Sequence, residues 1–68
     1  MDNVFKLIEI VGTSEESYEK AIKNALDKAS KTIKEISWFE VIQQRGTILN
    51  NGNIQYQVVV KIGFKLIV

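Results

Sequence analysis

The C-terminal segment alternates apolar and other residues, and this pattern constrains the fold more than any other feature of the chain. Every even position from 54 to 68 is apolar: Ile54, Tyr56, Val58, Val60, Ile62, Phe64, Leu66 and Val68. A period of two is typical of a β-strand that packs one face on a core. We therefore predict a strand from about Ile54 to Val68 with its even positions against a helix. The odd positions then face away from the helix: Gln55, Gln57, Val59, Lys61, Gly63, Lys65 and Ile67.

The residues before this strand predict a β-hairpin. The turn consists of Asn50, Asn51, Gly52 and Asn53, and its Asn-Gly pair suits the positive φ angles of hairpin turns. The partner strand runs from Ser37 to about Ile48. The hairpin therefore joins two long strands.

The N-terminal run from Val4 to Val11 predicts another strand, because it is rich in β-branched and aromatic residues. Both of its alternating faces are apolar, with Phe5, Leu7 and Val11 on one face and Val4, Ile8 and Ile10 on the other. A single helix covers only one face of a sheet. We expect another subunit to cover the second face.

The spacing of apolar residues predicts one amphipathic helix over about residues 15–34. Thr13 is the expected cap, with Glu16 completing a capping box. The apolar positions recur every three or four residues: Tyr18, Ala21, Ile22, Ala25, Leu26, Ala29 and Ile33. The opposite face carries several lysines, which indicate either a solvated surface or an anion site.

The predicted fold class is α+β: β-α-β-β order, with a three-stranded antiparallel sheet curled around one long helix. The 68 residues form a single domain, residues 1–68. A chain this short buries only about 60% of its unfolded surface, so we expect it to form a homo-oligomer.

Composition excludes several functions. The absence of cysteine and histidine removes disulfides, thiolate and imidazole metal sites and histidine-based catalytic triads. Glu9, Asp27 and Glu40 are not spaced as a general acid and base, so we expect no enzyme. The net charge of +1 argues against nucleic-acid binding. We find neither a signal peptide nor an apolar run of about 20 residues, so we expect a cytoplasmic protein that does not enter membranes.

The hairpin offers the clearest candidate site. Trp38 is the only tryptophan, and with Gln57 it is expected on the outward sheet face. An indole stacks on any flat heterocycle, and a glutamine amide both donates and accepts hydrogen bonds. Trp38 could instead be partly buried packing or an interface anchor. Arg45 could hold a phosphate or a ring carbonyl, or pair with a carboxylate.

Three segments, taken in their order along the chain, resemble the dodecin family of small flavoproteins. The first is Val11-Gly12-Thr13-Ser14-Glu15-Glu16-Ser17 after the first strand. The second is Trp38-Phe39-Glu40-Val41, with Arg45-Gly46-Thr47 seven residues beyond the tryptophan. The third is Tyr56-Gln57-Val58 with Gly63-Phe64-Lys65-Leu66. The resemblance runs from about residue 4 to 66.

The resemblance implies a hollow dodecamer in which pairs of flavins lie between two symmetry-related tryptophans. Trp38 would then stack on the flavin, and Gln57 would hydrogen-bond the pyrimidine edge of the ring. Arg45, Gln43 and Thr47 would contact the pocket rim or the ligand tail. Lys65 stands where relatives often carry arginine near subunit contacts and phosphate groups. This chain departs from the family in its apolar end, residues 66–68, and in Gln43-Gln44.

The expected function is therefore non-catalytic binding, storage and sequestration of flavin, either riboflavin or FMN. Stacking on the indole would quench the excited flavin and protect against light. One alternative is a structural, shell-forming homo-oligomer without flavin. Another is an assembly that binds coenzyme A, as some members of the family do.

Overall fold

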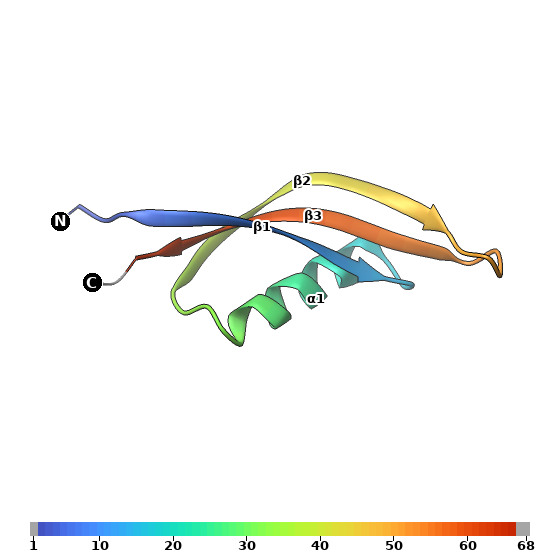
Figure 1. Ribbon diagram of the computed structural model, residues 1–68, viewed down its shortest axis with the longest axis horizontal. Coiled ribbons are helices and arrows are strands. Elements are labelled where there is room, and N and C mark those ends of the chain that lie inside the picture. Colours follow the sequence, from blue (N-terminus) through green and yellow to red (C-terminus); the bar gives the residue numbers. More distant parts are fainter. Residues whose placement is uncertain (1, 67–68) are drawn as a thin grey trace.

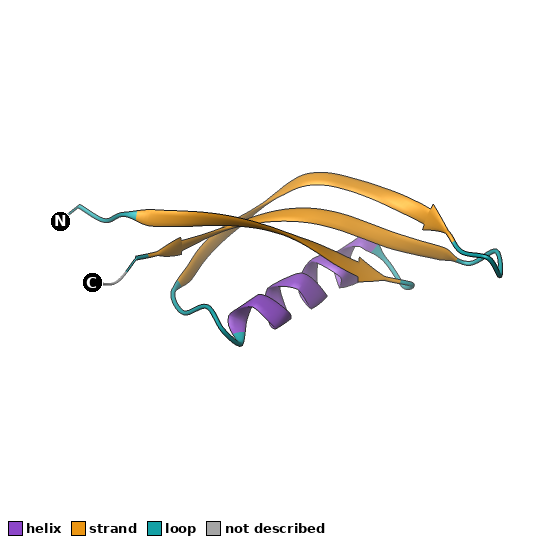
Figure 2. Ribbon diagram, viewed as in Figure 1, coloured by secondary structure: helices purple, strands orange, loops and turns teal. Residues whose placement is uncertain are grey.

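The computed structural model describes residues 2–66, which fold in the order β1 (Phe5–Ser14), α1 (Tyr18–Ser30), β2 (Ile36–Ile48) and β3 (Ile54–Lys65). The strands form one sheet in the order β1-β3-β2, and both neighbours of β3 run antiparallel to it. Figure 1 shows α1 lying along one face of the curved sheet. Figure 2 shows the two layers, sheet and helix. The predicted α+β fold is confirmed.

The core lies between α1 and the even positions of β3. Val58, Val60 and Ile62 are completely buried, as the alternation predicts. Facing them, α1 presents a stripe of small residues at helical spacing: Ala21, Ala25 and Ala29. Alanine lets the helix backbone approach the sheet closely. Full burial of each valine or isoleucine side chain contributes about 1.5–3 kcal/mol.

Strand β1 is apolar on both faces, as predicted. Ile8 and Ile10 pack against the core. Phe5, Leu7 and Val11 lie on the other face and are 41%, 50% and 53% exposed in the protomer. One helix therefore leaves a row of large apolar side chains on the far side of the sheet.

The helix begins later than predicted, and the expected capping box is wrong. Thr13 lies in β1 opposite Gln57, so strand pairing already engages its backbone. The cap is Ser17, whose Oγ accepts a hydrogen bond from the Lys20 N–H at 3.0 Å. Glu16 instead donates its backbone N–H to the Ser14 Oγ at 2.9 Å.

The helix also ends earlier than the predicted residue 34. Its last residue is Ser30, and the backbone N–H groups of Thr32 and Ile33 both donate to the Ala29 carbonyl. Glu35 then takes a left-handed conformation with φ 62°, which turns the chain into β2. The side-chain spacing continues to Ile33, which packs against the core, so spacing alone could not locate this end.

The strands also differ from their predicted limits. β1 begins at Phe5 rather than Val4 and continues past Val11 to Ser14, because its ladder with β3 extends to Tyr56. β3 ends at Lys65 instead of Val68, although the Leu66 N–H still donates to the Val4 carbonyl at 2.8 Å. The predicted positions 67 and 68 lie outside the described residues.

The predicted Asn-Gly turn is confirmed at Gly52, which has φ 87°. Asn51 contributes differently, because its side-chain oxygen accepts a hydrogen bond from the Asn53 N–H at 3.0 Å. The turn is closed by Leu49, whose N–H donates to the Asn53 carbonyl at 2.7 Å and whose carbonyl accepts from the Gly52 N–H at 2.9 Å. These contacts set the register between β2 and β3.

The positive φ at Gly52 generates a first prediction. Gly52→Val places a β-branched residue in a left-handed conformation that such residues rarely adopt, so we expect a loss of roughly 1 kcal/mol or more in the free energy of unfolding. Denaturant unfolding measures the loss. Open space surrounds this glycine, so any loss of stability comes from backbone strain and not from steric clashes. An unchanged unfolding midpoint would therefore contradict this account of the turn.

A second prediction concerns Gly12, which lies under the helix. A Cβ at this position would lie 2.8 Å from the Ala25 Cβ and would collide with the Ala21 backbone carbonyl. We expect Gly12→Ala to lower the free energy of unfolding by about 1–3 kcal/mol or more, as overpacked cores do. Gly46→Ala is the control, because its nearest neighbour would be the Ile54 Cγ2 at 3.5 Å. Equal stability of the two variants would contradict the close helix–sheet approach.

A candidate ligand site on the open sheet face

We call the face of the sheet turned away from α1 the open sheet face. Residues opposite one another on neighbouring strands share a face, so the register arranges the side chains in rows across β1, β3 and β2. The rows are Leu7–Gly63–Trp38, Glu9–Lys61–Glu40, Val11–Val59–Gln43 and Thr13–Gln57–Arg45, and Thr47 lies opposite Gln55 beyond them. The face thus has an aromatic end and a polar end.

A β-bulge in β2 brings the candidate residues onto this face. Strict alternation along β2 would turn Trp38 and Arg45 to opposite faces, because one number is even and the other is odd. The pairing with β3 shifts between Val41 and Gln43, so Ile42 is an extra residue. Beyond the bulge the odd positions Gln43, Arg45 and Thr47 share the open sheet face with Trp38. The sequence pattern does not reveal this shift.

The indole of Trp38 lies directly on the sheet. It is opposite Gly63, and the Phe5 ring meets it edge-on, with ring centroids 5.1 Å apart and an angle of 63° between the planes. The residue is 43% exposed in the protomer. A flat aromatic surface is therefore available to a ligand or to another subunit.

Four polar side chains form a hydrogen-bonded chain at the other end of the face. Arg45 donates from Nε to the Gln57 Oε1 at 2.9 Å and from Nη1 to the Gln43 Oε1 at 2.7 Å. Gln57 donates from Nε2 to the Gln55 Oε1 at 3.0 Å. Within the protomer, Arg45 pairs with amide oxygens and not with the carboxylate that the sequence allowed. Both the donor and the acceptor of the half-buried Gln57 are thus engaged within the protomer.

The two central candidates do not meet within one protomer. Trp38 lies opposite Gly63, and Gln57 lies six residues earlier on β3. At about 3.3–3.4 Å per residue, the separation along the strand is about 20 Å. A three-ring heterocycle stacked on Trp38 cannot reach Gln57 of the same chain. A ligand that contacts both residue types must lie between two copies of the protein.

Lys65 lies at the aromatic end, opposite Phe5. It is therefore close to Trp38 and far from Arg45, Gln43 and Thr47. Between the two ends, Lys61 is flanked by Glu9 on β1 and Glu40 on β2. The open sheet face thus places a charged row between the indole and the amides.

The structure adds residues that sequence reasoning did not assign to the site. The sequence placed Phe5 on an apolar face, Gln55 at an outward position, and Gly63 at an outward position within the third family-like segment, but gave none of them a role in the site. Their contacts depend on strand register, which no local pattern specifies. The pairing of Phe5 with Lys65 and of Trp38 with Gly63 follows only from the assembled sheet.

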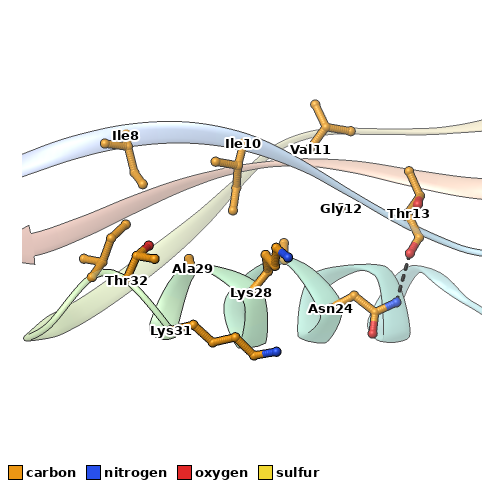
Figure 3. A pocket seen from close by; sticks show the side chains of 12 residues that line it. Ile8, Ile10, Val11, Gly12, Thr13, Asn24, Lys28, Ala29, Lys31 and Thr32 are labelled. Carbon is orange, nitrogen blue, oxygen red and sulfur yellow. Dashed lines mark hydrogen bonds between the residues drawn. The ribbon is translucent and has the colours of Figure 1, made fainter.

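A groove lies on the helix side of the sheet, between β1 and α1. Figure 3 shows this groove, which has a volume of about 750 Å³. Its walls are apolar in part, with Ile8, Ile10 and Ala29, and the Lys28 side chain also lines it. Across it, the Asn24 side chain donates to the Thr13 carbonyl at 2.9 Å. None of the predicted site residues lines the groove.

Two features are missing from residues 2–66. These residues contain no group of three or more histidine, cysteine, aspartate or glutamate side chains placed to hold a metal ion. Within the same part of the chain, α1 is neither long nor apolar enough to cross a membrane.

Comparison with known proteins identifies relatives over nearly the whole chain. Residues 4–67 match the Dodecin family model. A dodecin from Thermus thermophilus is 52% identical over 66 residues, which cover 97% of this chain and 96% of that protein. A calcium dodecin from Mycobacterium tuberculosis is 33% identical over 64 residues, which cover 94% and 90%.

Solved structures of relatives have the same fold. The W38F mutant of the T. thermophilus dodecin is 48% identical, with a TM-score of 0.91 over 98% of this chain and 100% of that chain. The dodecin from Streptomyces davaonensis is 35% identical, with a TM-score of 0.92 over the full length of both chains.

The exposed apolar residues of the open sheet face generate a third prediction. Phe5, Leu7, Val11 and Trp38 are each more than 40% exposed, and a soluble monomer rarely exposes so large an apolar cluster. We expect stable oligomers without added ligand, as measured by light scattering at micromolar protein. Leu7→Glu should shift the population towards smaller species, whereas Lys20→Glu on the helix surface should not. A folded wild-type monomer would contradict the prediction.

Proposed function

The chain belongs to the dodecin family, and on this premise we propose that it binds and stores free flavin, riboflavin or FMN, without catalysing a reaction. The binding form is a homododecamer, and each flavin stacks on the Trp38 indole. The cytoplasmic location expected from the sequence is part of the proposal.

The observation that carries the proposal is the position of Trp38. An exposed indole supported from below by the sheet offers one flat surface to a flat ring. Stacking of a heterocycle on an aromatic side chain contributes about 1–3 kcal/mol per ring. The relative from T. thermophilus has been studied as W38F and R45A mutants, which bear the numbers of Trp38 and Arg45 in this chain.

Stacking also supplies a photochemical function. An indole in contact with excited flavin transfers one electron to it, and the electron returns without net oxidation or reduction. The excitation is lost as heat before the flavin reacts with oxygen. The protein therefore stores flavin in a dark, non-reactive form.

The polar end of the open sheet face, contributed by a second subunit, completes the site. Because about 20 Å separate Trp38 from Gln57 within one chain, the glutamine that hydrogen-bonds the ring edge belongs to another copy. A ligand edge with both donor and acceptor replaces the Arg45 and Gln55 contacts of Gln57. Binding consequently depends on assembly.

The remaining candidates have supporting roles. Arg45, Gln43 and Thr47 share the open sheet face with Gln57, where they contact the rim of the pocket or the ligand tail. Lys65, at the Trp38 end, offers a positive charge to the phosphate of FMN. We propose neither calcium nor coenzyme A as a ligand, because no contact among residues 2–66 favours either one.

A fluorescence titration of riboflavin and FMN tests the proposal. We expect Trp38→Ala to weaken binding by about 1–3 kcal/mol and to restore the fluorescence of any flavin that remains bound. Gln57→Ala should weaken binding by about 1 kcal/mol and leave quenching intact, because the indole is still present.

Phe39→Ala is the matched control for the tryptophan. Phe39 is the adjacent aromatic residue, but it lies opposite Ile62 on the helix side of the sheet. The Phe39→Ala variant should therefore keep both the flavin affinity and the flavin quenching of the wild type. If assembled Trp38→Ala binds and quenches flavin like the wild type, the flavin site is wrong. A colourless wild-type oligomer that leaves riboflavin fluorescent would instead favour the structural shell.

A further inference from the structure

We propose that Gly63 and Phe5 form a seat that holds the Trp38 indole with one ring face against the sheet and the other face open. Gly63 and Phe5 are then positioning residues that determine how a ligand stacks. The seat itself is a property of the protein alone. Its consequence for a ligand depends on the flavin-binding function proposed above.

Gly63 supports the indole from below. A Cβ built on this residue would lie 2.7 Å from Cδ2 of the indole and closer still to Cε2 and Cζ2. Real Cβ atoms essentially never approach a neighbour within 3.0 Å. Three contiguous ring carbons lie at similar distances from that point, which places Gly63 under the face of the ring and not at its edge. Only a residue without a side chain leaves room for the indole here.

Backbone geometry gives no other reason for glycine at this position. Of the glycines among residues 2–66, only Gly52 has a positive φ, so Gly63 has a conformation open to any residue. Glycine inside a strand also weakens the sheet, because it packs no side chain. Close approach by another group is the usual reason to find one there, and the approaching group is the indole of Trp38.

Phe5 and a second bulge orient the ring laterally. The Phe5 ring contacts the indole edge-on at a centroid distance of 5.1 Å, a favourable aromatic geometry. The β2–β3 register also shifts between Ile36 and Trp38, which makes Ser37 an extra residue. A bulge re-aims the side chains beside it. Neighbours on β1, β2 and β3 thus all act on a single side chain.

A seated indole has two consequences for binding. It loses little rotamer freedom when a ligand arrives, because the protein has already ordered it. It also accepts a ring on one face only, because the sheet occupies the other. The seat therefore limits each tryptophan to one stacked ligand, whose ring lies roughly parallel to the indole.

The test uses the tryptophan as its own reporter. Trp38 is the only tryptophan, so its emission and its accessibility to acrylamide report the seat in ligand-free protein. We expect Gly63→Ala to raise the indole, shift its emission to longer wavelength and increase acrylamide quenching. Gly46→Ala should change neither, because an added Cβ there makes only ordinary contacts at 3.5 Å and beyond.

Flavin titration then measures the consequence for the ligand. We expect assembled Gly63→Ala to bind riboflavin roughly 5- to 150-fold more weakly, which is the loss of one stacking interaction. Gly46→Ala should bind like the wild type. Unchanged emission and unchanged acrylamide quenching in Gly63→Ala would overturn the seat.

The two proposals fail in different ways. If wild-type protein binds no flavin, the proposed function is wrong, and the ligand-free tryptophan signals still decide the seat. If wild-type protein binds flavin but Gly63→Ala keeps its tryptophan signals, the seat is wrong and the function stands.

If the Gly63→Ala variant does not assemble, a double-mutant cycle with Trp38→Ala tests the proposal instead. If the damage comes from the indole, Gly63→Ala should be harmless in a Trp38→Ala background, and the double variant should melt at or above the temperature of Trp38→Ala alone. If the double variant is as defective as Gly63→Ala itself, the clash is not with the indole, and the proposal is overturned.

Discussion

The packing of β3 against the alanine stripe of α1 is the contact on which the rest of the structure depends. It buries Val58, Val60 and Ile62 completely and thereby directs the odd positions of the same strand to the open sheet face. Because β3 is the central strand, its orientation decides which side chains of β1 and β2 stand in each row. Gln57 and Gly63 reach the candidate site only because their even neighbours are held under the helix.

The open sheet face carries two groups of candidate residues that a single protomer cannot bring together. Its aromatic end offers the exposed indole of Trp38, and its polar end offers the amide of Gln57, about 20 Å away along the strand. The apolar side chains between and beside them need a cover that one helix cannot supply. In the proposed function, the same surface serves both assembly and ligand binding, and the flavin site exists only where two copies meet.

The local sequence pattern was sufficient to predict the helix and the strands but not the residues at which they begin and end. The alternation of residues 54–65, the helical spacing from Tyr18 to Ala29 and the turn at Gly52 all appear in the structure where they were expected. The capping residue was missed, because ladder pairing with β3 holds Thr13 in a strand and leaves the cap to Ser17. Side-chain spacing continued past Ser30 although the helix did not, since Ile33 still packs on the core from outside the helix.

The sequence by itself determined the β-α-β-β order, the inward face of β3 and the residue types that form the candidate site. These follow from periodicity and turn chemistry, which act over a few neighbouring residues. Only the tertiary structure decided which candidates share a face. The extra residue Ile42 reverses the alternation of β2, so Arg45 joins Trp38 although their spacing implies opposite faces. Gly63 likewise became part of the site only when pairing brought the indole over it, since contacts between strands depend on register and not on the sequence around either residue.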